Sequence, residues 1–105
     1  MKFLCTFDEG SKGMGFPSMK EFFMNEKYEY QDDVVEYLKT KGKPGMVRTM
    51  RPKDYFTGEP INVEYVFLDD GVYAWTSPLA YYVEKYNLKL PDDFIEHVLK
   101  MTGKK

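Results

Sequence analysis

Cys5 and His97 are the only cysteine and histidine of this chain, so they are its only candidates for a thiol–imidazole catalytic pair. In such a pair the imidazole accepts the thiol proton and the thiolate attacks the substrate. Cys5 lies between Phe3 and Phe7 in an apolar segment, where a thiol is expected to be buried and unreactive. His97 lies one helical turn after Asp93, which can satisfy the imidazole without catalysis. The sequence therefore predicts no catalytic residue and no enzymatic activity.

Paired acids are the next candidates for a functional site, because carboxylate oxygens bind hard cations. Asp69-Asp70 and Asp92-Asp93 provide such oxygens, but the spacing of a calcium-binding loop is absent. One cysteine and one histidine also exclude the usual zinc ligand sets. Both acidic pairs have structural explanations, the first in a hairpin turn and the second at the start of a helix. We expect no metal and no cofactor.

A glycine-rich stretch, Gly10 to Gly15, lies between an expected strand and an expected helix, which is the order of a phosphate-binding loop. The stretch lacks the spacing of the Walker motif and continues into Phe16-Pro17. A flexible loop is the better interpretation.

Charge is strongly segregated along the chain. Residues 39–53 contain six basic residues and no acid, whereas all 17 acids lie outside this segment. A run of this kind can contact phosphate groups, so we consider an anionic-ligand or nucleic-acid site as an alternative function. No nucleic-acid-binding motif is recognisable, and the acidic remainder would repel phosphate. The residues of this alternative site would be Lys43, Arg48, Arg51 and Lys53.

The acidic remainder and the nine tyrosines favour a different partner, a basic protein. Opposite charge speeds the encounter of two proteins, and tyrosine provides contact area once they have docked. We expect this protein-binding surface to consist of five acids and one exposed tyrosine: Asp32, Asp33, Glu36, Asp69, Asp70 and Tyr81.

The first half of the chain must position these residues through one strand and two helices. Alternating residues predict a strand over residues 2–7, and Ser18 with Glu21 forms a capping-box pattern at the start of a short helix. A helix is expected over residues 32–40, with acids in its first turn and lysines at its end.

The second half reads as strands followed by helices. Strands are expected over residues 46–50 and 61–67, and Asp70-Gly71 predicts a two-residue hairpin loop that would pair Leu68 with Tyr73 and Val66 with Trp75. A helix should then begin with Ser77 as its N-cap and Pro78 as its first residue, and end at Asn87. Pro91 should open the last helix.

The 105 residues are expected to form a single α+β domain, residues 1–105, with a small antiparallel sheet of three or four strands and about four short helices packed on it. No apolar run is long enough to cross a membrane, so no membrane contact is expected. A single cysteine and the absence of a signal-peptide pattern favour a reducing cytoplasm. The oligomeric state and the strand order do not follow from these patterns.

Four segments resemble small bacterial proteins, some of which are immunity partners of polymorphic or contact-dependent toxins. They are Thr57-Gly58-Glu59-Pro60-Ile61, Asp70-Gly71-Val72-Tyr73-Ala74-Trp75-Thr76-Ser77, Tyr81-Tyr82-Val83-Glu84-Lys85-Tyr86 and Leu90-Pro91-Asp92-Asp93-Phe94-Ile95. The resemblance covers less than half of the chain and includes no catalytic motif. It implies a non-enzymatic module that neutralises a cognate toxin. Together with the acidic remainder, it favours a basic toxin domain as the partner.

Overall fold

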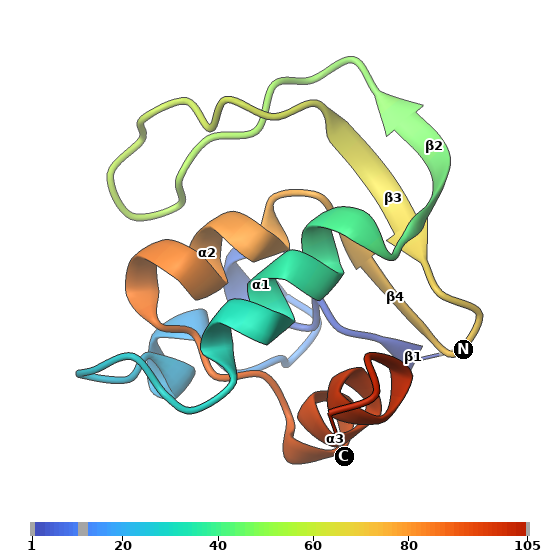
Figure 1. The fold of residues 1–105 in the computed structure, drawn as a ribbon. Helices are drawn as coiled ribbons and strands as arrows, with labels where there is room; N and C mark the ends of the chain where they lie inside the picture. The colour runs from blue at the N-terminus through green and yellow to red at the C-terminus, as the bar shows by residue number, and fades with distance from the viewer. Residues whose placement is uncertain (1, 11–12, 105) are drawn as a thin grey trace.

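The computed structural model, which describes residues 2–10 and 13–104, contains a four-stranded mixed sheet and three α-helices (Figure 1). The strand order is β1-β4-β3-β2; β1 and β4 are parallel, and the other neighbours are antiparallel. The strands are β1 (Lys2–Phe3), β2 (Lys43–Arg48), β3 (Tyr65–Asp69) and β4 (Tyr73–Thr76). The helices are α1 (Gln31–Thr40), α2 (Leu79–Tyr86) and α3 (Asp92–Met101), with 3₁₀ turns η1 (Asp8–Gly10) and η2 (Met19–Phe22).

The α+β class predicted from the sequence is confirmed, with two differences in detail. The sheet is mixed because β1 lies parallel to β4. The helix expected after Ser18 is only the 3₁₀ turn η2, although its capping box is present, with the Ser18 N–H donating to the Glu21 carboxylate at 3.1 Å. Part of the glycine-rich stretch, Ser11 and Lys12, lies outside the described residues.

Three of the expected strands are shorter or shifted. β1 ends at Phe3 rather than residue 7, although β4 continues to Thr76 and the Leu4 N–H still donates to the Ala74 carbonyl at 2.8 Å. The strand expected over 61–67 begins only at Tyr65, since Ile61 belongs to an irregular segment in which its N–H donates to the Pro52 carbonyl at 2.9 Å. β2 likewise covers Lys43–Arg48 rather than 46–50.

The register of the β3–β4 hairpin differs from the predicted one by two residues. Leu68 pairs with Trp75 and not with Tyr73, so the two loop residues are Gly71 and Val72. The Asp70 carboxylate causes the shift, because it accepts the N–H groups of Val72 at 2.8 Å and of Tyr73 at 2.7 Å. Gly71 alone in this loop has a positive φ, 94°.

The predicted helix ends are largely confirmed. Asn87 ends α2 in the left-handed conformation with φ 54°, and Pro91 directly precedes α3. Ser77 does not cap α2, however, because its hydroxyl donates to the Glu64 carbonyl at 2.5 Å and accepts the Val66 N–H at 2.9 Å. It thus links the start of β3 to the end of β4.

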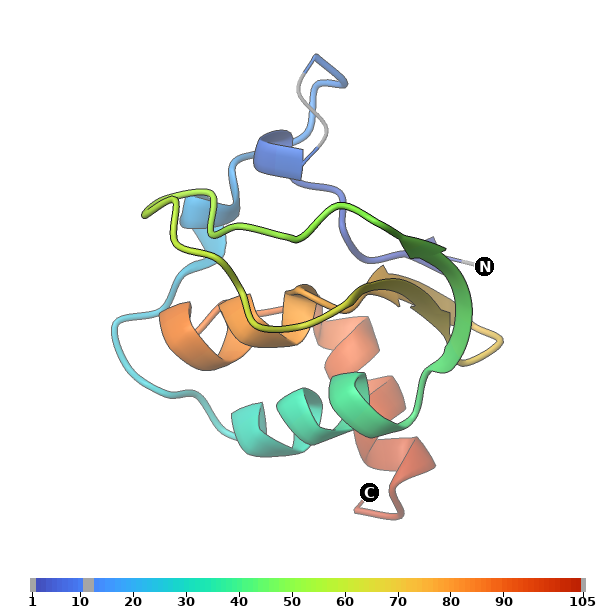
Figure 2. The ribbon, with the colours of Figure 1, turned by 90° about the horizontal axis from the view of Figure 1, so that it is seen from above.

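The core lies on one side of the sheet, where α1 and α3 pack against Tyr73 and Trp75. Trp75 is fully buried, contacts Phe94 of α3, and donates its indole N–H to the Leu38 carbonyl of α1 at 3.1 Å. Viewed from above, α1 and α3 lie on one side of the sheet and the N-terminal segment on the other (Figure 2). No helix of residues 2–10 and 13–104 has the length and apolar character to span a bilayer.

We expect Gly42→Ala to destabilise the protein by about 1–3 kcal/mol, because overpacking a filled core has this cost. Gly42 joins α1 to β2, and a Cβ there would lie 2.8 Å from Leu68 Cβ and 2.8 Å from the Trp75 ring. Urea denaturation measures the change. The matched control is Gly45→Ala, whose Cβ would meet only the Phe67 carbonyl oxygen at 3.4 Å. Equal unfolding midpoints for the two variants would contradict this packing.

Candidate anion-binding groove on the sheet face opposite α1 and α3

The face of the sheet opposite α1 and α3 carries aromatic side chains and an arginine. Strand pairing sets Phe67 beside Thr76 and Arg48 beside Tyr65, and paired residues of neighbouring strands point to the same side. Phe3, which pairs with Ala74 on the β4 side, is 43% exposed. The N-terminal segment lies on this side of the sheet, and Gly10 of η1 lines one of its pockets. The rings that α1 and α3 leave uncovered here offer a surface for contact with a ligand.

Arg48 is the central cation of this face. Its guanidinium carbon lies 5.7 Å from the ring centre of Tyr65 and 5.5 Å from that of Phe67, within the range of cation–π attraction. No described acid lies within salt-bridge distance of Arg48. The rings therefore orient the guanidinium, and no described carboxylate neutralises it.

Two pockets share Arg48 and Tyr65 as walls, and we call the two together the sheet groove. The Tyr55 pocket, of about 240 Å³, is also lined by Phe3, Cys5, Gly10, Tyr55, Phe67 and Thr76. The Arg51 pocket, also of about 240 Å³, is lined in addition by Thr49, Met50, Arg51, Asn62, Val63 and Glu64. The cation thus lies at the boundary between two pockets of equal size.

The long connection between β2 and β3, residues 49–64, forms part of both pockets; we call it the flap. It passes over α2 (Figure 2). The fully buried side chain of Asp54 holds it there, accepting the hydroxyl protons of Tyr81 at 2.8 Å and Tyr86 at 2.7 Å, both from α2. The same carboxylate accepts the N–H groups of Phe56 at 2.7 Å and Thr57 at 3.1 Å.

The environment of Asp54 favours the ionised form. Burial alone would raise the pKa of this carboxyl, but the hydrogen bonds from Tyr86, Phe56 and Tyr81 outweigh burial and lower the pKa to about 2. The flap is therefore attached to α2 by a negative charge that persists at neutral pH.

Tyr55 is held in place beside this anchor. Its N–H donates to the Tyr82 hydroxyl at 3.1 Å, and the two rings are stacked with centres 5.4 Å apart. The Tyr55 ring remains 48% exposed at the edge of its pocket. A ring that is packed on one side and open on the other is suited to contact a second planar group.

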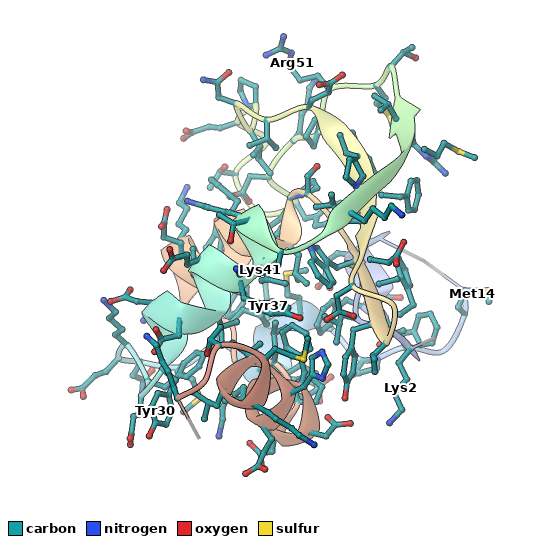
Figure 3. All side chains as sticks on the ribbon, turned by 45° about the vertical axis from the view of Figure 1, so that its right-hand side comes forward. Lys2, Met14, Tyr30, Tyr37, Lys41 and Arg51 are labelled. Carbon is teal, nitrogen blue, oxygen red and sulfur yellow. The ribbon has the colours of Figure 1, made fainter. Side chains whose placement is uncertain are left out.

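The four basic residues predicted to bind an anion are only partly brought together. Arg48 and Arg51 line the same pocket. Lys43 lies at the opposite end of β2, where its backbone is paired with that of Asp69 on β3. Lys53 lies inside the flap, where its backbone forms an isolated bridge with Pro60. Figure 3 shows Arg51 at the end of the molecule remote from Tyr37 and α3. The groove therefore includes two of the four.

The residues predicted to bind a basic protein lie on three separate elements. On α1, Asp32 forms an ion pair with Lys27 at 2.5 Å and Asp33 forms one with Lys104, while Glu36 lies on an exposed part of the same helix. Asp69 accepts the Gly71 N–H at 3.0 Å in the hairpin. Tyr81 is half-buried on α2, where it donates to Asp54.

Asp70 is an interior residue. Its side chain is 5% exposed and accepts the Tyr37 hydroxyl at 2.5 Å and the His97 Nε2–H at 2.7 Å. Figure 3 shows Tyr37 of α1 directed toward α3. Burial would raise the pKa of Asp70, but the hydrogen bond from Tyr37 and those from the hairpin N–H groups lower it to about 2. Asp70 thus ties the hairpin to α1 and α3.

The histidine and the cysteine are not brought together. His97 contacts Asp70 rather than Asp93, its expected partner, because Asp93 forms an ion pair with Lys2 at 3.3 Å. The Cys5 sulfur lies 3.4 Å from the Thr76 hydroxyl oxygen, and burial raises the pKa of the thiol. No group of three His, Cys, Asp or Glu in the described part of the chain could hold a metal ion.

Comparison with models of known protein families found no match, and comparisons with curated proteins and with solved structures found none either.

We expect Asp54→Asn to lower the free energy of unfolding by about 2 kcal/mol, because hydrogen bonds to a charged group contribute roughly 1.5–3 kcal/mol. The substitution keeps the shape of the side chain but leaves one carboxamide oxygen for four donors. Urea denaturation of Asp32→Asn is the matched control, since Asp32 is 78% exposed. If both variants unfolded at the same urea concentration, Asp54 would not be the anchor.

Acid should destabilise the protein between about pH 4 and pH 2. Asp54 and Asp70 both have a lowered pKa in the folded state, about 2, compared with about 3.9 in an unfolded chain. A lowered folded-state pKa contributes stability that is present above pH 4 and is lost as the pH falls toward 2. Unfolding free energies measured across this range should fall less steeply in Asp70→Asn than in the wild type; equal slopes would argue against the buried carboxylate.

Proposed function

We propose that this chain is a non-enzymatic binding module whose ligand carries a phosphate beside a planar ring, as in a nucleotide unit. The observation that carries the proposal is Arg48, a cation without a described acidic partner, held over Tyr65 and Phe67 between two pockets. Free nucleotides and single-stranded nucleic acid share this chemistry.

The Arg48 guanidinium is suited to bind the anionic part of the ligand. Arginine presents several N–H donors in a planar fork that matches a phosphate, and charge-assisted hydrogen bonds are about twice as strong as neutral ones. Arg51 lines the same pocket and adds a second positive charge. Because the described acids leave both cations unpaired, a phosphate would not have to displace an existing partner.

The aromatic side chains are suited to bind the planar ring of the ligand. Phe3, Tyr55 and Phe67 line one pocket, and the first two are almost half exposed. Stacking of a nucleobase on an aromatic side chain contributes roughly 1–3 kcal/mol and tolerates any base. A ring and a phosphate at neighbouring points are the two halves of a nucleotide.

A protein partner, including a toxin, is the second candidate. Its support comes from exposed apolar side chains beside the basic residues: Met46 is 71% exposed, Val47 51% and Met50 59%. Methionine and arginine are enriched at protein interfaces, and the charge here fits an acidic partner. Strand addition at β2 is disfavoured by Pro44, which lacks an N–H, and by the bulge between Pro44 and Val47. We propose the cytoplasm as the location of either activity.

Titration with a fluorescein-labelled single-stranded 12-mer and with AMP tests the first candidate. We expect the 12-mer to bind at low salt, with an affinity that falls steeply as salt rises because phosphate contacts release counterions. Arg48→Gln should weaken binding of both ligands at least tenfold. Lys89→Gln is the matched control, since Lys89 lies outside the groove in an ion pair with Asp92 at 3.4 Å.

Two results would reject a nucleotide ligand. One is that neither the 12-mer nor AMP binds at low salt; the other is that Arg48→Gln binds as tightly as Lys89→Gln. Displacement of the 12-mer by polyglutamate of equal charge, at equal concentration, would show that binding does not require a planar ring. That result would favour an acidic protein as the partner.

A further inference from the structure

We propose that the groove takes a dinucleotide step of a single strand, with the linking phosphate at Arg48, one base in the Tyr55 pocket and the next base in the Arg51 pocket, where Glu64 selects bases that carry an amino group. This inference rests on the proposed function. It concerns which ligand of that class binds and which bases it contains.

The dinucleotide footprint is inferred from the size and placement of the two pockets. Each measures about 240 Å³, which is below the roughly 300–1,000 Å³ of a pocket that encloses a drug-sized ligand. Each is therefore suited to a single ring. Arg48 and Tyr65 belong to both pockets, so a cation lies at the junction of two ring-sized spaces. This arrangement matches the base–phosphate–base alternation of a strand, whereas a single nucleotide would leave one pocket unused.

The two pockets differ in chemistry, which carries the second step. The Tyr55 pocket is walled by aromatic rings and hydroxyl groups, with no acid among the described residues that line it. The Arg51 pocket combines the apolar side chains of Met50 and Val63, which are 59% and 41% exposed, with the amide of Asn62 and the carboxylate of Glu64. The first pocket suits stacking of any base, and the second also offers groups that can read a base edge.

Glu64 gives the specificity. A carboxylate repels phosphate but accepts a hydrogen bond from an exocyclic amine, as acidic side chains do from the N4 amine of cytosine. Thymine and uracil have no exocyclic amine, and their N3–H lies between two carbonyl oxygens, which a carboxylate repels. The base beside Glu64 should therefore be cytosine, adenine or guanine rather than thymine or uracil.

A duplex does not meet these requirements. Its bases are stacked on one another and paired, so neither ring could enter a separate pocket without unpairing. Single-stranded ligands present their bases freely to aromatic platforms. The groove should therefore discriminate strongly between the two forms.

Isothermal titration with a length series tests the footprint: CMP, the dinucleotide pdCpdC, (dC)4, (dC)8 and a (dC)8·(dG)8 duplex. We expect affinity to rise at least tenfold from CMP to the dinucleotide, to change less than threefold per added nucleotide beyond it, and to be at least tenfold lower for the duplex than for (dC)8. If CMP bound as tightly as the dinucleotide, with binding still dependent on Arg48, the footprint would be overturned and the proposed function would remain. If no member of the series bound, the proposed function itself would fail.

Base choice is tested with pdCpdC and pdTpdT. The wild type should bind the cytosine ligand at least fivefold more tightly, and Glu64→Gln should reduce this ratio to below twofold, because a carboxamide can donate to thymine as well as accept from cytosine. Glu59→Gln, an exposed flap acid outside both pockets, is the matched control and should keep the wild-type ratio. A ratio unchanged in Glu64→Gln, or lost equally in Glu59→Gln, would overturn the role of Glu64.

Discussion

The buried carboxylate of Asp54 is the interaction on which the shape of the groove depends. The flap contributes few regular backbone hydrogen bonds of its own. Its attachment to α2 runs through this side chain and the two tyrosines that donate to it, together with the contacts of Tyr82 with Lys53 and Tyr55. An ionised group in the interior is costly unless it is fully hydrogen-bonded, and here four donors satisfy its two oxygens. The anchor places Tyr55 against Tyr82 and so sets one wall of the groove.

Folding changes which charges lack a partner, so the charge pattern along the chain does not show which charges are available to a ligand. Several acids are engaged within the fold: Asp54 and Asp70 receive hydroxyl and N–H donors, and Asp33 and Asp93 form ion pairs with lysines. The basic segment after α1 has no such partners among the described residues. A net excess of acid in the composition therefore coexists with a basic segment that no described acid neutralises through an ion pair. This is why we propose an anionic ligand, rather than the basic protein partner expected from composition.

Local patterns predicted the helices well, and long-range contacts account for what they missed. The ends of α2 and α3 follow from Asn87 and Pro91, whose conformational preferences act within a few residues. The hairpin register depends on the Asp70 carboxylate, which also accepts hydrogen bonds from Tyr37 and His97, 33 and 27 residues away in the sequence. The basic half of the groove could be predicted from the sequence, as the run of positive charge around Arg48. The aromatic half could not be predicted, because the pairing of Arg48 with Tyr65 and the return of the flap over α2 join residues that are distant in the sequence. The alternation of Tyr65 and Phe67 in a predicted strand was the one signal that could have indicated it.

The outer strand of the sheet, β2, also bears on how copies of this chain behave toward one another. It exposes methionine and valine side chains on an open edge, which is the arrangement that usually templates stacking of identical chains into fibrils. Pro44 removes a backbone donor from this edge, the bulge that follows breaks its regular spacing, and Lys43 and Arg48 add like charges that would repel a second copy. The same strand can therefore present an adhesive surface to a ligand of opposite charge while resisting self-assembly at high concentration.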